Sequence, residues 1–550
     1  MSVPTAELRA PAPAARSEPR ATPFSTWLTG GRLYVVLTAA ALVIAAFSLL
    51  IPSTPSYDPW AWLVWGKDIA HLKLHTTGGP TWKPLPVLFT TLFAPFGKAQ
   101  PDLWLVIARA GALMAVAMVF RFAWRITRWL TLRPDDEATG RRWPLAPVLL
   151  AALISAAALV VSRGFISDNA LGYSEGLMTA LVLIAVERHL DGARRQAFAV
   201  GFFAALDRPE LWLIWGPYGL YLWWKDPGAR KLVVVLFALI PVLWFLPEYW
   251  GSGHFFRGVS RAQHPRSNSP AFASCPFCTE LSQHAWAAVL IRIKVVALLA
   301  MLVAAGGLWW ARSSWLVRGF PWVRFGPLSD GLRARVLIVA AALFGLAWWV
   351  LIAVLTQAGF SGNDRYLVLG AALIGIAGGI GWGWGAFGAA TLLRRVARSA
   401  GALASPAVAT GASVIATATL FLAIPPRIWW KIPATHRALV YQAHLRADLT
   451  KVVSEVGGPA RILRCGTVMT EGFQVPMLAW ALGVHTLQVQ ASPLPRAPLP
   501  PPPNVIFQTR AQRNAHLLPI VRAWTNAHYQ LVAHVRTFRV YANCAGGVTL

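Results

Sequence analysis

The sequence predicts an all-α polytopic membrane protein with a small C-terminal α/β domain, and three observations support this. The 550-residue chain is 56% hydrophobic and only 13% charged, whereas soluble proteins carry about 25% charged residues. Several uncharged stretches are long enough to cross a bilayer as α-helices. The net charge of +28 comes from basic residues at the ends of these stretches. That pattern is typical of cytoplasmic loops near anionic lipid and argues against nucleic-acid binding.

Residues 1–32 are rich in Pro, Ala and Arg and are expected to form a disordered cytoplasmic tail. The uncharged stretch 33–51 follows, with no small-residue cleavage site close behind it, so it is not a cleavable signal peptide. Arg9, Arg16, Arg20 and Arg32 precede the stretch and predict a cytoplasmic N-terminus. The following segment, SYDPWAWLVWGKD, is therefore expected outside.

Apolar stretches continue through residue 424 and predict a transmembrane module of about eleven helices. The expected spans are 33–51, 103–120, 145–161, 170–186, 197–206, 211–224, 232–246, 295–311, 336–356, 367–393 and 402–424. When they alternate in direction, every Arg/Lys cluster beside a span falls on the cytoplasmic side. The stretch 84–96 is too short to span and holds three prolines, so it predicts an interfacial or re-entrant helix.

Residues 425–550 change in composition and predict a soluble extracytoplasmic α/β domain. Helices are expected over 438–456 and 513–527, strands over 460–464, 486–490 and 504–508, and a hairpin over 529–541. The proline-rich segment 493–503 predicts an extended loop. The domain is basic, which suits a surface facing anionic lipid or cell-wall polymer.

The cysteines also bear on the compartment, because an even number outside the cell membrane predicts disulfides. All four fall outside in this topology: Cys275, Cys278, Cys465 and Cys544. Cys465 paired with Cys544 would tie together the ends of the soluble domain, and Cys275 with Cys278 would close a tight loop. The CxxC also permits a redox motif, or half a zinc site with His264 or His284. Neither is favoured, because the chain has no second CxxC and no thioredoxin-like context.

Ionisable residues at the outer edge of apolar helices are candidates for function because placing them there is costly. The acids are Asp58, Asp68, Asp168, Glu175, Asp207, Glu210 and Asp364. The cations are Lys67, Lys83, Arg163, Arg208 and Arg365. Cations and carboxylates on one membrane face suit a lipid-linked substrate that carries phosphate: the cations would hold the phosphate and one carboxylate would act as a base.

The first outer acid also has a structural interpretation. Asp58 could be a helix N-cap with Pro59 at the first helical position, which would also fix its carboxylate in place. The tryptophans that follow it, Trp60, Trp62 and Trp65, could form an interfacial aromatic belt. Asp68, three turns along the same helix, suits a solvated or salt-bridged position.

The other candidates have structural interpretations too. Arg208 and Glu210 flank Pro209 and could form an ion pair at a helix break. Asp364 and Arg365 could be solvated loop residues. Lys83 could snorkel from the apolar segment toward the interface.

Four short motifs, in this order, resemble the GT-C superfamily of membrane glycosyltransferases, which use polyprenyl-phosphate-linked sugars. They are Lys-Pro-Leu-Pro from residue 83, Gly-Tyr-Ser-Glu from 172, Ala-Ala-Leu-Asp-Arg-Pro-Glu from 204 and Asp-Arg-Tyr-Leu from 364. The likeness covers about residues 33–370. It is greatest to the branch of protein O-mannosyltransferases and lipid A aminoarabinose transferases, with some likeness to bacterial mannosyltransferases.

The resemblance implies a role for each matching residue. Asp58 matches the acid that acts as general base on the acceptor, and Lys83 matches a contact to the lipid phosphate. The remaining matches at the donor site are Tyr173, Glu175, Arg208, Glu210, Arg365 and Tyr366. Supporting roles are open to Trp62, Lys67, Asp68 and Asp168.

This sequence departs from the family pattern at one position. Many members have a second acid directly after the first-loop acid, where this chain has Pro59. The departure argues against a bound metal and for cations that stabilise the departing phosphate. No cofactor is expected.

The predicted function is inverting transfer of a sugar from a polyprenyl-phosphate donor to an acceptor hydroxyl on the extracytoplasmic side. The expected partners are membrane lipid, the lipid-linked donor and an acceptor that is a glycan, lipid or protein. A transporter or flippase of lipid-linked saccharides is an alternative, disfavoured by the lack of an inverted repeat. A non-catalytic assembly protein of the cell envelope is another. The sequence leaves the sugar and the acceptor open.

Overall fold

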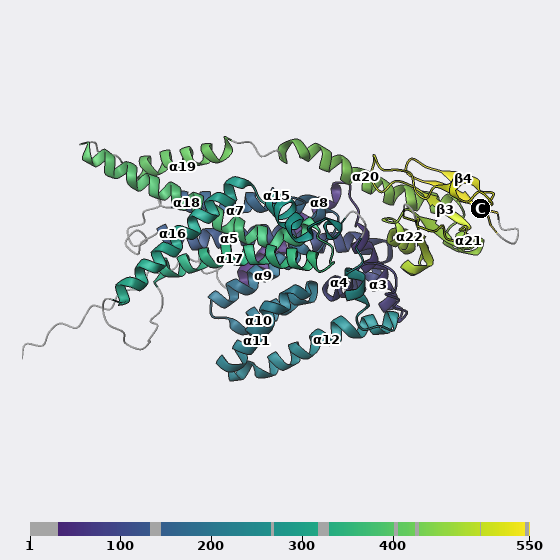
Figure 1. Cartoon of the computed structure of the whole chain (residues 1–550), viewed down its shortest axis with the longest axis horizontal. Helices are drawn as coiled ribbons and strands as arrows, with labels where there is room; N and C mark the ends of the chain where they lie inside the picture. The colour runs from purple at the N-terminus through teal and green to yellow at the C-terminus, as the bar shows by residue number, and fades with distance from the viewer. Residues whose placement is uncertain are drawn as a thin grey trace, which may run out of the picture.

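The structure is a computed structural model that describes residues 31–131, 145–265, 269–316, 329–400, 405–423, 428–494, 497–544 and 549–550. A body of packed helices joins a small domain that holds the chain's C-terminus (Figure 1). The predicted tail, apart from Gly31 and Arg32, lies outside the described residues. The chain is an all-α membrane protein with a small C-terminal α/β domain.

Each of the eleven predicted spans corresponds to one helix. These helices are α2 (Gly31–Phe47), α5 (Gln100–Thr131), α7 (Leu145–Val160), α9 (Glu175–Leu190), α10 (Arg194–Asp207), α11 (Trp212–Lys225), α12 (Arg230–Ser252), α16 (Ile291–Leu316), α17 (Asp330–Gln357), α18 (Val368–Ser399) and α19 (Pro406–Leu422). Within the described ranges, six helical segments are long and apolar enough to cross a membrane, and α7 and α19 are shorter apolar helices. The number of crossings and their direction stay predictions.

Glycines let α18 pack closely against its neighbours at the centre of the body. A Cβ on Gly379 would lie 2.7 Å from the backbone oxygen of Ala151 in α7, and one on Gly378 would lie 2.6 Å from that of Ile293 in α16. Small residues at such contacts allow helix backbones to approach, as is common in membrane bundles. These close approaches hold α7, α16 and α18 together.

Two short helices follow α2: α3 (Tyr57–Ala70), which carries candidate residues, and α4 (Pro84–Phe93), whose N-cap is Lys83. The prediction that 84–96 forms a short helix is confirmed for 84–93. Asp58 as N-cap is wrong: the cap is Ser56, whose carbonyl accepts from Trp60 N at 2.9 Å. The helix begins two residues earlier than expected because Ser56 N donates to the Leu171 carbonyl, which anchors the cap residue.

The tryptophans of α3 do not form an interfacial belt. Trp60, Trp62 and Trp65 are at most 2% exposed. They pack inward, Trp62 against Trp104 of α5 and Trp65 against Trp82. The aromatic-belt interpretation fails because α3 is enclosed by α4, α5 and the C-terminal domain.

The C-terminal domain contains a five-stranded sheet in the order β2-β1-β3-β5-β4. Its strands are β1 (Val468–Thr470), β2 (Val489–Ala491), β3 (Val505–Gln508), β4 (Gln530–His534) and β5 (Arg539–Ala542). β1 runs parallel to β2 and β3, whereas β5 runs antiparallel to β3 and β4. Three helices accompany the sheet: α20 (Ile428–Glu455), α21 (Pro459–Cys465) and α22 (Val475–Leu482).

Several predicted elements of this domain are confirmed, namely the helix within α20, the strand at β3 and the β4–β5 hairpin. The strand predicted over 460–464 is wrong, because Pro459 starts α21 at the first helical position. The helix predicted over 513–527 is wrong: Thr509 pairs with Leu518 in a β-bridge and Pro519 interrupts the segment. The strand predicted over 486–490 is half right, because a 3-10 turn (Thr486–Gln488) precedes β2.

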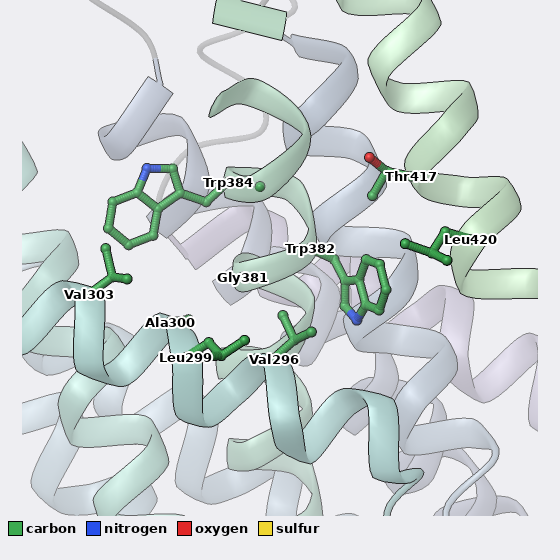
Figure 2. A pocket seen from close by; sticks show the side chains of 10 residues that line it. Val296, Leu299, Ala300, Val303, Gly381, Trp382, Trp384, Thr417 and Leu420 are labelled. Atoms are coloured by element: carbon green, nitrogen blue, oxygen red, sulfur yellow. The ribbon is translucent and has the colours of Figure 1, made fainter. Parts of the chain in front are cut away.

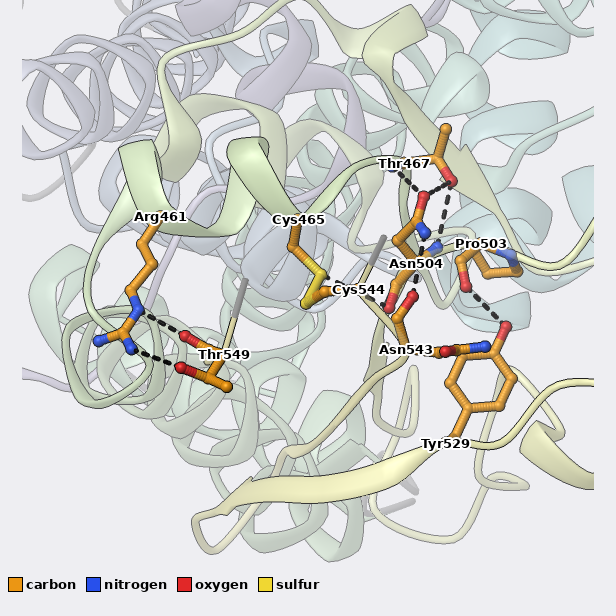
Figure 3. The surroundings of a disulfide bond; sticks show 9 residues. All are labelled: Arg461, Cys465, Thr467, Pro503, Asn504, Tyr529, Asn543, Cys544 and Thr549. Carbon is orange, nitrogen blue, oxygen red and sulfur yellow. Dashed lines mark hydrogen bonds between the residues drawn. A yellow bond between two sulfur atoms is a disulfide. The ribbon is translucent and has the colours of Figure 1, made fainter. Parts of the chain in front are cut away.

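Both predicted disulfides are formed. Cys465 at the end of α21 joins Cys544 after β5, beside a set of hydrogen bonds centred on Asn504 (Figure 3). Asn504 accepts from Thr467 N at 2.9 Å and donates to the Asn543 carbonyl at 3.0 Å. The disulfide thus ties the end of α21 to the chain that follows β5, next to the start of β3. The Cys275–Cys278 disulfide closes the first turn of α14 (Pro276–Thr279).

Candidate active site

A cavity of about 690 Å³ lies where α3, the end of α10, α12 and α17 meet the turn η7 (Asp364–Leu367). Its walls carry the ionisable residues Asp58, Lys83, Arg208, Glu210 and Arg365. Aromatic side chains line it as well, including Trp82, Trp212, Trp244 and Tyr366. Four motifs spread over about 300 residues therefore contribute to one cavity.

Glu175, the first residue of α9, binds two of these cations. Its Oε1 lies 3.2 Å from Lys83 Nζ and 3.4 Å from Arg365 Nε, and the side chain is 2% exposed. Lys83 also donates to Ser174 Oγ at 3.2 Å and lies 4.0 Å from the buried carboxylate of Asp207. Glu175 thus fixes both cations, and the snorkelling interpretation of Lys83 is wrong because Lys83 points into this buried network.

Asp58 projects into the cavity and is held there by Arg365. Arg365 Nη2 donates to Asp58 Oδ2 at 2.7 Å, and the two side chains are 15% and 16% exposed. The Arg365 guanidinium lies 4.1 Å from the centre of the Tyr173 ring. Tyr173 in turn donates to Ser56 Oγ at 3.2 Å, which links this cluster to the start of α3. Arg365 is therefore half-buried and paired with carboxylates, and the interpretation of it as a solvated loop residue is wrong.

Arg208 and Glu210 do form an ion pair at a helix break, at 3.7 Å across Pro209. The Arg208 guanidinium also lies 3.7 Å from the centre of the Tyr366 ring. Because both partners line the cavity, the structural pair and a role in binding are compatible here.

The four possible supporting residues separate into two groups. The Trp62 ring lies 5.3 Å from Lys83 Nζ and so contacts the cluster. Burial raises the pKa of Asp168 to about 7, and the charges of Arg365 and Glu175 lie close enough to affect this pKa as well. Asp168 is not among the residues that line the cavity.

Lys67 and Asp68 face the C-terminal domain instead. Lys67 Nζ lies 5.2 Å from the Trp480 ring, and Asp68 Oδ2 lies 2.9 Å from His485 Nδ1. Burial is the main cause that raises the pKa of Asp68 and lowers that of Lys67. Asp68 is thus in the paired position considered for it, and neither residue lines the cavity.

Other cavity residues were not assigned to the site from the sequence. Asp207 lies within the Ala-Ala-Leu-Asp-Arg-Pro-Glu motif, so its spacing was an available signal. Glu248 of α12, His284 and Phe473 also line the cavity. They come from the end of α12, the π-helical segment Glu280–Ala285 and the C-terminal domain, and no local motif marks them. Within the described residues, no group of three or more His, Cys, Asp or Glu side chains is placed to hold a metal ion.

A second pocket of about 450 Å³ lies among α16, α18 and α19 (Figure 2). Val296, Leu299, Trp382, Thr417 and Leu420 are among its lining residues. None of the lining residues is ionisable. Its apolar lining suits a hydrocarbon chain and provides no acid, base or cation for catalysis.

The crystal structure of ArnT from Cupriavidus metallidurans bound to undecaprenyl phosphate is similar to this chain, with 13% sequence identity and a TM-score of 0.47. The match covers 94% of this chain and 99% of that one. No family model matches the chain, and no curated protein matches it. A likeness of this degree establishes no shared activity, so the functional proposal depends on the cavity's residues.

Proposed function

We propose that the protein is an integral-membrane glycosyltransferase of the GT-C type that moves a sugar from a polyprenyl-phosphate donor to an acceptor hydroxyl. The observation that supports this most strongly is that Asp58 lies in one cavity with Lys83, Arg208 and Arg365. Aromatic walls suit a sugar, and the three cations suit its phosphate. In this proposal the cavity opens on the extracytoplasmic side and the N-terminus is cytoplasmic.

The donor phosphate would bind Lys83 and Arg365 and compete with the carboxylates that now neutralise them. Arg365 binds Asp58 directly at 2.7 Å. A phosphate that draws Arg365 toward itself would weaken this ion pair and free the Asp58 carboxylate to contact the acceptor hydroxyl. Donor binding and activation of the base would then be coupled through one guanidinium.

Asp58 would next remove the proton from the acceptor hydroxyl, and the acceptor oxygen would attack the anomeric carbon. The bond from this carbon to the phosphate oxygen breaks, and direct displacement inverts the anomeric centre. Positioned cations stabilise the charge that develops on the phosphate. This route needs neither a metal nor a cofactor. Glu175 and Asp207 would hold the cations in place.

Release of free polyprenyl phosphate tests the proposal directly. The purified chain in proteoliposomes would receive a lipid extract from its source membranes together with the envelope fraction as acceptor. A transferase produces polyprenyl phosphate, detectable by mass spectrometry. A transporter moves the lipid-linked saccharide without cleaving it, and an assembly protein does neither. If the folded, reconstituted protein released no polyprenyl phosphate, the proposal would be refuted.

A further inference from the structure

A second hydrogen-bonded set lies at the same cavity and joins Asp364, the first residue of the fourth motif, to His284 and Arg163, which belong to no motif. His284 lies in a short π-helical segment (Glu280–Ala285) between α12 and α16. Its Nδ1 lies 2.6 Å from Asp364 Oδ1, and Arg163 Nε binds the other oxygen of Asp364 at 2.8 Å. π-Helical segments often occur at functional sites. Both His284 and Asp364 line the cavity.

The geometry fixes which imidazole nitrogen is available. Since Asp364 accepts from Nδ1, that nitrogen carries a hydrogen and Nε2 is the one left to contact a ligand. The His284 side chain is 21% exposed, so it is accessible from the cavity. A carboxylate that orients a histidine in this way also stabilises its protonated form.

The motif cations at the cavity are already neutralised by carboxylates. Lys83 pairs with Glu175, Arg208 with Glu210, and Arg365 with Asp58 and Glu175. None of the three readily gives up a proton in such a pair. His284 differs from them, because histidine is the side chain that exchanges a proton near neutral pH.

We propose that His284 is a further catalytic residue that donates its Nε2 proton to the departing phosphate of the donor. The inference rests on the proposed function. As the anomeric carbon–oxygen bond breaks, its electron pair goes to the phosphate oxygen, which takes the proton from His284. Asp58 takes the acceptor proton in the same displacement. The products are the glycosylated acceptor and a singly protonated polyprenyl phosphate, and proton exchange with water restores both residues.

The groups that face His284 are Asp364, Glu280 and Arg163. The hydrogen bond to Asp364 is the main cause that raises the pKa of His284. Glu280 is fully buried, and neither of its oxygens has a hydrogen-bond partner in the described chain. Burial raises the pKa of Glu280 to about 7. His284 therefore stays protonated to a higher pH than a free histidine, and it loses its proton as the pH rises through its raised pKa.

Binding of farnesyl phosphate, a short product analogue, tests the charge on His284. Isothermal titration calorimetry from pH 6 to pH 9 would compare the full-length wild type with His284→Gln. We expect His284→Gln to bind about tenfold more weakly at pH 6, where the imidazolium would donate a charge-assisted hydrogen bond to the phosphate, and equally at pH 9. The ligand's own ionisation is common to both proteins and cancels in this ratio. A ratio that does not change with pH would overturn the inference.

Two variants keep the test decisive. His264→Gln is the matched control, because His264 is an exposed histidine that also lies between α12 and α16, and its Nδ1 contacts only the Ser260 carbonyl among its described partners. It should bind like the wild type at every pH. Asp364→Asn should move the pH midpoint of binding downward, because the imidazolium loses its carboxylate. An unmoved midpoint would count against the proposal even if His284→Gln failed to fold.

The catalytic step has its own readout. The rate of polyprenyl phosphate release should fall above the His284 pKa in the wild type, and His284→Gln should lose this basic limb. A basic limb that persists in His284→Gln would refute proton donation. If farnesyl phosphate binds no variant and nothing is released, the proposed function itself fails. If the ligand binds and Asp58→Asn alone stops release, only the role of His284 is wrong.

Discussion

Replacing Glu175 with Gln should destabilise the protein strongly, because this carboxylate fixes two cations at once. Gln keeps the size of the side chain but removes the charge that faces Lys83 at 3.2 Å and Arg365 at 3.4 Å. Removing one partner of a buried ion pair typically costs about 3–5 kcal/mol. The value should lie in the upper part of this range, since Glu175 is 2% exposed and both cations lose a partner.

The change can be followed by the thermal unfolding of detergent-solubilised protein, with tryptophan fluorescence as the signal. Glu210→Gln is the matched control, because Glu210 pairs with one cation at 3.7 Å and is 14% exposed. It should lower the midpoint less. If both variants lowered the unfolding midpoint equally, or if Glu175→Gln did not lower it, Glu175 would not be the residue that holds Lys83 and Arg365 in place.

Three other changes test the two disulfides and the packing of the C-terminal domain. Replacing Cys465 and Cys544 with Ser opens a loop of 79 residues and should cost about 4 kcal/mol by loop entropy. Replacing Cys275 and Cys278 with Ser opens a loop with a sequence separation of 3 and should cost roughly 2 kcal/mol. Limited proteolysis would compare the stability of the two variants. A larger loss of stability in the Cys275 and Cys278 variant would contradict the loop argument. Trp480→Phe removes the donor to Gln100 Oε1 at 2.9 Å and should cost about 1–3 kcal/mol. Thermal unfolding measures that loss, and unchanged stability would show that the contact does not hold the domain against α5.

Much of the helical body could be predicted from the sequence, because uncharged stretches of membrane length have few alternative structures. All eleven predicted spans correspond to helices. The C-terminal domain was harder to predict. Its strands have only three to five residues, and local patterns did not identify β1 or α22. Segment 460–464 shows the difficulty, since its apolar residues suit a strand but Pro459 begins a helix.

The motif residues of the candidate site could be found because they are charged residues in apolar surroundings. Their partners could not, because pairing depends on tertiary packing. Nothing near Asp58 in the sequence indicates that Arg365 binds it across 307 residues. The contact of Asp68 with His485, a residue of the C-terminal domain, was equally invisible. His284 was considered only as a partner of the CxxC, whereas folding places it against Asp364.

The most direct test of the central claim is the turnover of Asp58→Asn, measured as polyprenyl phosphate release under single-turnover conditions. Asn preserves the shape of Asp58 and cannot accept the proton. Loss of a general base slows a reaction by about 10²–10⁴-fold, and we predict a loss in that range. Asp102→Asn serves as the control. The Asp102 carboxylate lies 2.5 Å from Arg446 Nη1, and Asp102 does not line the cavity. This variant should retain near-normal turnover. Near-normal turnover of folded Asp58→Asn would contradict the assignment of Asp58 as the base.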